Sequence, residues 1–132
     1  IDDEPFMRKL VGDVLDHIGV RHIDTSHDGN NALRLITKSV QKYDLIICDL
    51  EMPVMSGLEF IRAFRSLPKK HRPDTPIIVL TGHSEDSNLQ TALEAGIHGF
   101  LKKPISKALL TSRIEHAMTS PPYDANILKQ DC

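Results

Sequence analysis

Five residues of this chain carry side chains that could together hold a metal ion and a phosphoryl group. They are Asp2 and Asp3 at the start, Asp49 and Thr81 after two apolar runs, and Lys103 before a proline. Two or three carboxylates with a backbone carbonyl suit Mg²⁺, which keeps several waters. A hydroxyl, an ammonium and a cation around one carboxylate could neutralise phosphoryl oxygens while that carboxylate attacks phosphorus. Each residue alone has a plain structural explanation, as a helix cap, a turn residue or a solvated surface group.

Strands that alternate with helices are predicted to bring these residues together. Leu45–Cys48 and Ile77–Leu80 are continuous apolar runs, which is typical of strands buried on both faces of a parallel sheet. Val20–Ser26 and Ile97–Leu101 predict two further strands. Apolar residues three and four positions apart predict five helices, over Pro5–Ile18, about Asn30–Val40, Gly57–Leu67, a segment capped by Ser84–Asp86 that ends at Ala95, and a segment after Ser106. Ligands of such sheets bind at the carboxyl ends of the strands, where the Asp49 carboxylate would lie.

This order of elements lacks a strand before the first helix. The first strand of a doubly wound sheet is normally central, but only Ile1 precedes the acidic pair Asp2–Asp3. We therefore expect several apolar residues to precede Ile1 in the natural protein. An intact mass equal to that of the 132 residues would contradict this for the sample measured.

Composition indicates one ordinary globular domain. The chain has 132 residues, of which 40% are hydrophobic and 26% charged, with a formal net charge of -2. This balance gives no electrostatic reason to expect binding to nucleic acid or to an anionic membrane. Its two cysteines, Cys48 and Cys132, do not make a disulfide framework, so we predict a cytoplasmic location. No apolar run approaches the roughly 20 residues that cross a bilayer.

The chain resembles a known family, the phospho-acceptor receiver domain of two-component response regulators, of the chemotaxis-receiver kind. The motifs that carry the resemblance, in order, are Asp2-Asp3-Glu4, Asp28-Gly29 with Ala32-Leu33, Asp49-Leu50-Glu51-Met52-Pro53, Met55 with Gly57-Leu58-Glu59, Thr81-Gly82, Ala95-Gly96 and Lys103-Pro104. The resemblance implies an α/β, flavodoxin-like fold with a doubly wound five-stranded parallel sheet in the order 2-1-3-4-5, here without its first strand. The predicted receiver domain covers residues 1–118, and residues 119–132 form a tail or linker.

The resemblance also assigns roles around the acceptor. Asp49 would be phosphorylated by a sensor histidine kinase or a histidine phosphotransfer protein. Mg²⁺, or Mn²⁺ in its place, would bind Asp3, Asp49 and the backbone carbonyl of Glu51, with Asp2 acting through a water. Lys103 would pair with phosphoryl oxygens.

Further residues would carry the signal or set its duration. Thr81 would be the switch hydroxyl and Phe100 the switch aromatic, for which the alternative is a plain core residue. Glu51 and His83 lie at positions that vary in the family, and we predict that they set the phosphoryl lifetime. If neither Glu51→Asn nor His83→Ala changes dephosphorylation, that prediction is wrong. The Lys103–Pro104 peptide would be cis.

The leading interpretation is phosphorelay signal transduction, in which the domain catalyses its own phosphotransfer and dephosphorylation but has no separate substrate. The fourth helix, last strand and fifth helix would bind an output domain, a downstream protein or a second copy. One alternative is a receiver-like module that binds partners without phosphorylation. Another is a phosphohydrolase of the haloacid dehalogenase type, which Asp49-Leu50-Glu51 resembles superficially, although that family uses Asp at the second acidic position.

Overall fold

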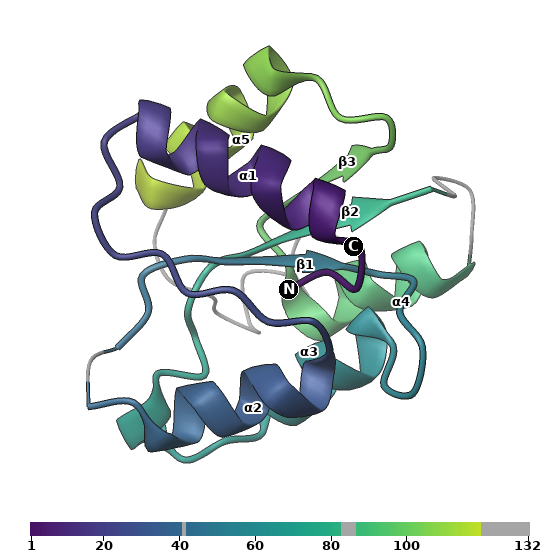
Figure 1. Ribbon diagram of the computed structural model, residues 1–132. Coiled ribbons are helices and arrows are strands. Elements are labelled where there is room, and N and C mark those ends of the chain that lie inside the picture. Colours follow the sequence, from purple (N-terminus) through teal and green to yellow (C-terminus); the bar gives the residue numbers. More distant parts are fainter. Residues whose placement is uncertain (41, 83–86, 120–132) are drawn as a thin grey trace.

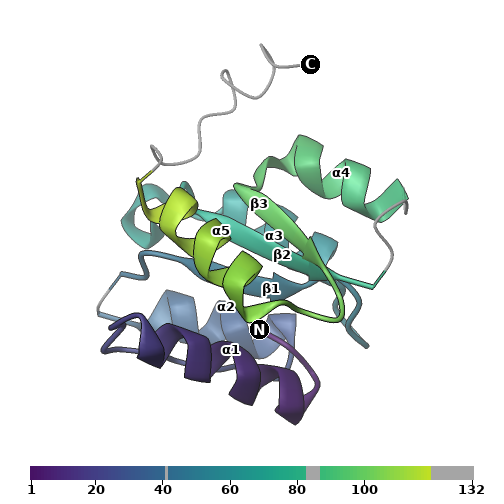
Figure 2. The same cartoon turned by 90° about the horizontal axis from the view of Figure 1, so that it is seen from above.

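A parallel sheet lies at the centre of the structure, which is a computed structural model that describes residues 1–40, 42–82 and 87–119 (Figure 1). Over these residues the sheet has three strands, β1 (Ile46–Asp49), β2 (Ile77–Thr81) and β3 (Gly99–Lys102), in the order β1-β2-β3. In the register, Asp49 lies opposite Leu80, and Thr81 lies opposite Lys102. The carboxyl ends of the three strands therefore meet at one edge, as Figure 2 shows from above.

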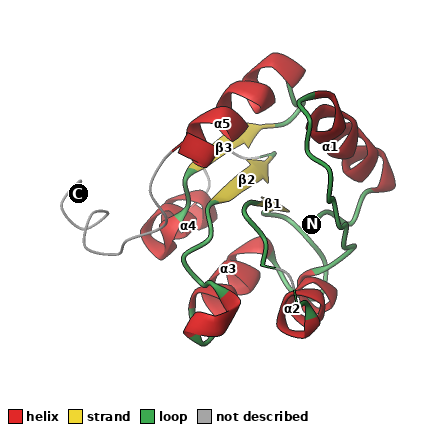
Figure 3. Cartoon of the chain, turned by 90° about the vertical axis from the view of Figure 1, so that its left-hand side faces the viewer, coloured by secondary structure: helices red, strands yellow, loops and turns green. Residues whose placement is uncertain are grey.

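Five helices in the described residues cover the two faces of the sheet. They are α1 (Pro5–His17), α2 (Gly29–Lys38), α3 (Gly57–Arg65), α4 (Ser87–Gly96) and α5 (Lys107–Thr119), with a short 3-10 helix, η1, at Lys69–His71. Helices α1 and α5 lie on one side of the sheet, and α2, α3 and α4 contribute to the core on the other side (Figure 3). All five predicted helices are confirmed. The predicted cap of the fourth helix, Ser84–Asp86, and residues 120–132 of the predicted tail lie outside the described residues. None of the helices in the described part of the chain combines the length and the apolar character needed to cross a membrane.

Alternate residues of the central strands face two separate cores. Ile77 and Val79 pack with α2, α3 and α4, while Ile78 and Leu80 pack with α1 and α5. Every residue of β1 and β2 is buried. Because both faces are covered, the strands carry no polar alternation, and this is why the two apolar runs in the sequence were diagnostic.

The start of α3 fixes the loop that follows β1. Ser56 and Glu59 form a capping box, in which the Ser56 hydroxyl accepts a hydrogen bond from the Glu59 N–H at 3.2 Å. A Cβ atom on Gly57 would lie 2.3 Å from the backbone oxygen of Asp49. Only glycine therefore allows the helix to begin so close to the end of β1.

The predicted strand at Val20–Ser26 is wrong, because this segment runs beside the sheet without a strand ladder. Its end contacts the start of the chain, where the Asp2 N–H donates to the Ser26 carbonyl at 3.1 Å. The Ile1 nitrogen donates to the Ile47 carbonyl at 2.6 Å. Ile1 and Asp2 therefore lie between this segment and β1, in the place of a central strand.

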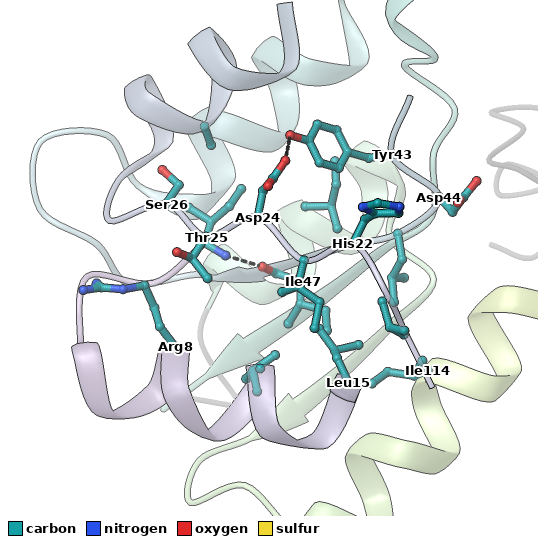
Figure 4. A pocket seen from close by; sticks show the side chains of 18 of the residues that line it. Arg8, Leu15, His22, Asp24, Thr25, Ser26, Tyr43, Asp44, Ile47 and Ile114 are labelled. Atoms are coloured by element: carbon teal, nitrogen blue, oxygen red, sulfur yellow. Dashed lines mark hydrogen bonds between the residues drawn. The ribbon is translucent and has the colours of Figure 1, made fainter. Parts of the chain in front are cut away.

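Beyond these two residues, the space between the segment and β1 is a cavity of about 700 Å³ (Figure 4). Its lining includes Leu15, Ile47 and Ile114, and the Tyr43 hydroxyl donates to Asp24 across its rim. In the described part of the chain no strand pairs with this segment, so it has no ladder partner, which accounts for the missing strand at 20–26. The expectation that apolar residues precede Ile1 stays a prediction.

Candidate functional site

The candidate site lies at the edge where the three strands end. Asp49 is the last residue of β1, Thr81 is the last residue of β2, and Lys103 directly follows β3. The Lys103 N–H donates to the Thr81 carbonyl at 2.7 Å, so the ladder fixes the spacing of these residues. The Asp49 and Thr81 side chains are buried, at 1% and 0% exposure. The structure thus brings together three of the residues singled out in the sequence.

Lys103 is surrounded by carboxylates. Its Nζ lies 3.2 Å from Asp49 Oδ2, 3.6 Å from Asp2 Oδ2 and 3.6 Å from Glu4 Oε1. The Lys103–Pro104 peptide is cis, as predicted. A single ammonium facing three carboxylates leaves this side of the site with excess negative charge.

The acidic residues form a group that fits a divalent cation. Carboxylate oxygens of Asp2, Asp3, Glu4 and Asp49 all lie within 4.8 Å of one another. Asp2 is held in place because its Oδ1 accepts from the Glu4 N–H at 2.9 Å, while its buried Oδ2 has no hydrogen-bond partner among the described residues. A buried carboxylate oxygen that has only a 3.6 Å contact with Lys103 and no hydrogen bond is what a hard cation such as Mg²⁺ would satisfy.

Glu4 was missed as a site residue in the sequence. It stands at the N-cap position of α1 but makes no side-chain cap hydrogen bond. The signal was present, since Glu4 continues the acidic run that begins with Asp2 and Asp3. Its side chain is exposed and reaches the group from the solvent side.

Burial raises the pKa of Asp49 to about 6, and the negative charge of Asp2 adds to this effect, while Lys103 opposes it. Burial by itself lowers the pKa of Lys103, but the charges of Asp49, Asp2 and Glu4 together hold it above its usual value. Asp49 is therefore mostly ionised and Lys103 is charged at neutral pH. The result is a desolvated carboxylate beside a fixed ammonium, which is an arrangement for nucleophilic attack on a charged group.

Glu51 contacts both neighbouring strand ends. Its N–H donates to Asp49 Oδ1 at 3.3 Å. Its carboxylate accepts from the Thr81 hydroxyl at 2.8 Å and from the Gly82 N–H at 3.2 Å. The sequence indicated a charge near the acceptor but not this contact, which depends on how the loop after β1 folds.

Two further residues were predicted to act near the acceptor, Phe100 and His83. Phe100 lies on β3 opposite Val79, and its side chain is 37% exposed, so it is not a core aromatic. His83 lies outside the described residues.

A family model supplies the decisive comparison, because the response regulator receiver domain matches residues 1–115. The chain belongs to this family. The chemotaxis protein CheY homolog of Campylobacter jejuni is 30% identical over 118 residues, which are 89% of this chain and 88% of that protein. The signal transduction histidine-protein kinase BarA of Escherichia coli is 32% identical over 110 residues, which are 83% of this chain but only 11% of the kinase.

A solved structure agrees with the fold of this receiver domain. The receiver domain of the sensor histidine kinase PA1611 from Pseudomonas aeruginosa, with a magnesium ion coordinated in its active-site cleft, is 28% identical with a TM-score of 0.78. The match covers 91% of this chain and 94% of that one. The flavodoxin-like fold class is therefore confirmed, and the chain is a receiver domain of phosphorelay signal transduction. The two alternative functions are not favoured.

Proposed function

We propose that Asp49 is the phospho-acceptor. The domain itself catalyses the transfer of a phosphoryl group from a donor to Asp49, with a divalent cation bound. The observation that carries this proposal is the placement of Asp49. Its carboxylate is 1% exposed, 3.2 Å from the Lys103 ammonium and next to three other carboxylates. A degenerate receiver would have no need to keep this costly group of buried charges.

In the transfer step an Asp49 carboxylate oxygen forms a bond to phosphorus. The bond from phosphorus to a histidine nitrogen of the kinase or phosphotransfer protein breaks, and its electron pair remains on the imidazole. Lys103 stays protonated and pairs with the phosphoryl oxygens as the phosphoryl group moves onto Asp49. Dephosphorylation transfers the phosphoryl group from Asp49 to water, which returns the carboxylate and releases inorganic phosphate. No other small molecule is needed as a substrate.

The cation that we propose is Mg²⁺, with Mn²⁺ as a substitute. Asp3, Asp49 and the backbone carbonyl of Glu51 would hold it directly, and Asp2 would contact it through a water. Glu4 belongs to the same acidic group and is a further candidate for contact through water. When bound, the cation neutralises phosphoryl oxygens that the single Lys103 ammonium leaves unpaired.

Thr81 and Phe100 are the residues that we propose carry the signal from the site. Thr81 lies on β2 beside the acceptor, and Phe100 lies on β3 next to Val79. An inward movement of Phe100 would change the surface of α4, β3 and α5, which we propose as the face for an output domain or protein, or for a second copy. Glu51 and His83 are proposed to set the phosphoryl lifetime. The free, fully buried Cys48 thiol is compatible with the reducing cytoplasm, the location that we propose.

Intact mass spectrometry tests this function directly. The protein is incubated with acetyl phosphate and Mg²⁺, and the same reaction is run with Asp49→Asn and with EDTA. We expect one phosphoryl adduct that is absent from both controls. A folded protein that gains no adduct would contradict the proposal, and an adduct on Asp49→Asn would place the acceptor elsewhere.

A further inference from the structure

The Glu51 carboxylate accepts hydrogen bonds from two donors at the end of β2. Its Oε1 accepts from the Thr81 hydroxyl at 2.8 Å, and its Oε2 accepts from the Gly82 N–H at 3.2 Å. Thr81 is fully buried, and its backbone is fixed by the sheet. Two adjacent donors that converge on one anionic group make a small anion-binding arrangement, which the chain fills with its own side chain.

This arrangement borders the acceptor. Asp49 lies opposite Leu80 in the register, so Thr81 is the next residue of the neighbouring strand and Gly82 directly follows the end of that strand. Glu51 also donates its N–H to Asp49 Oδ1 at 3.3 Å. The same residue therefore contacts the acceptor through its backbone and the end of β2 through its side chain.

A phosphoryl group on Asp49 would compete for these donors. It would bring a charge of about −1.5 to −2 and three strong acceptor oxygens to this edge. The Thr81 hydroxyl and the Gly82 N–H have one proton each to donate. A second anion at short distance would also repel the Glu51 carboxylate. Both donors cannot serve Glu51 and the phosphoryl group at full strength at the same time.

We propose that Glu51 is a latch, defined by its contacts with Thr81 and Gly82, that holds the end of β2 in its unphosphorylated arrangement until a phosphoryl group displaces it. Glu51 is then a positioning residue rather than a catalytic one. This inference rests on the proposed function of Asp49. It goes beyond an effect on phosphoryl lifetime, because it concerns the state of the protein before phosphorylation.

The test measures affinity for beryllofluoride, a non-covalent phosphoryl analogue, with Mg²⁺ present. The four proteins compared are the wild type, Glu51→Ala, Thr81→Val and the double variant. A hydrogen bond to a charged group changes an equilibrium by roughly tenfold to a hundredfold. We expect Glu51→Ala to bind the analogue about tenfold more tightly than wild type. In the Thr81→Val background the same change should raise affinity by no more than about threefold, because the hydroxyl contact is already gone.

Loss of a negative charge alone would also help an anion to bind. The double variant separates this electrostatic effect from the loss of the contact between Glu51 and Thr81. A purely electrostatic effect of Glu51 is the same in both backgrounds, and equal effects would overturn the latch. Glu51→Gln, which removes the charge but keeps an oxygen that can accept from Thr81, should give a smaller gain than Glu51→Ala. Equal gains would likewise overturn the latch. Wild type that fails to bind the analogue would refute the proposed function itself.

Amide hydrogen exchange in the unphosphorylated protein gives a second readout. We expect the Gly82 amide to exchange about tenfold faster in Glu51→Ala, because the variant lacks the acceptor. The Val79 amide, in the fully buried middle of β2, should keep its rate and serves as the control for global opening. If both amides accelerate equally, Glu51 merely stabilises the fold and the latch is wrong.

Discussion

Replacement of Asp49 by asparagine should make the protein more stable at neutral pH while abolishing phosphorylation. Asp49 is 1% exposed, and its pKa is raised from 3.8 to about 6, first by burial and then by Asp2. The folded state therefore binds a proton more tightly than the unfolded state does. Stability consequently falls as pH rises between about 4 and 6, and the loss is complete above pH 6.

The size of the effect follows from the two pKa values. A rise from 3.8 to about 6 corresponds to about 3 kcal/mol at pH 8 and to about 1 kcal/mol at pH 4.5. Asparagine has a similar shape and cannot ionise, so it does not carry this cost. The difference in unfolding free energy, Asp49→Asn minus wild type, should therefore grow by about 2 kcal/mol between pH 4.5 and pH 8.

Urea unfolding followed by circular dichroism, in EDTA to remove divalent cations, measures this difference. Asp13→Asn is a matched control, because Asp13 is 63% exposed and its contact with Lys9 is a surface ion pair. Such a pair contributes under about 1 kcal/mol, and its loss should show no comparable pH dependence. If the difference for Asp49→Asn changes by less than about 0.5 kcal/mol over this range, the charge of Asp49 is not desolvated and the reasoning fails.

Three further predictions address the neighbouring groups. Lys103→Ala should slow phosphorylation by acetyl phosphate about a hundredfold or more, because a preorganised charge is lost; an unchanged time course of the mass adduct would contradict this. Mg²⁺ at 100 times its dissociation constant should stabilise wild type by about 2.7 kcal/mol, whereas Asp2→Asn should need a higher concentration for the same rise in melting temperature. Gly57→Ala should cost about 1–3 kcal/mol in urea unfolding through overpacking, because its Cβ would lie 2.3 Å from the backbone oxygen of Asp49; Gly12→Ala, with nothing within 4 Å of its Cβ, is the control that should not destabilise.

The parts of the fold that were predictable from sequence are those with a strong local signal. The runs Leu45–Cys48 and Ile77–Leu80 indicated buried parallel strands, and the structure has β1 and β2 there with shifts of one residue. The start of α5 was indicated by its capping residue Ser106, whose hydroxyl accepts from the Leu109 N–H at 3.3 Å. These signals are local because each depends on residues within one element.

The prediction at Val20–Ser26 failed because a strand is not a local property. Mixed polar and apolar residues can form an edge strand only when a partner offers a ladder, and among the described residues no strand pairs with this segment. The contacts of Glu51 were out of reach for a similar reason. Its carboxylate meets Thr81 from 30 residues away, and only the path of the loop after β1 brings the two together.

The same geometry suits the switch that we propose at Asp49, whose pKa is raised to about 6 chiefly by burial. The site holds three carboxylates around one ammonium, so its electrostatic energy depends on which cation or anion binds there. A bound cation would offset the repulsion between the carboxylates. A phosphoryl group on Asp49 would change the local charge and would compete for the hydrogen-bond donors at the end of β2. Because Thr81 connects to β3 through the Lys103 N–H, a change at Asp49 has a short covalent and hydrogen-bonded route to Phe100. A site that was fully satisfied before phosphorylation would lack this response.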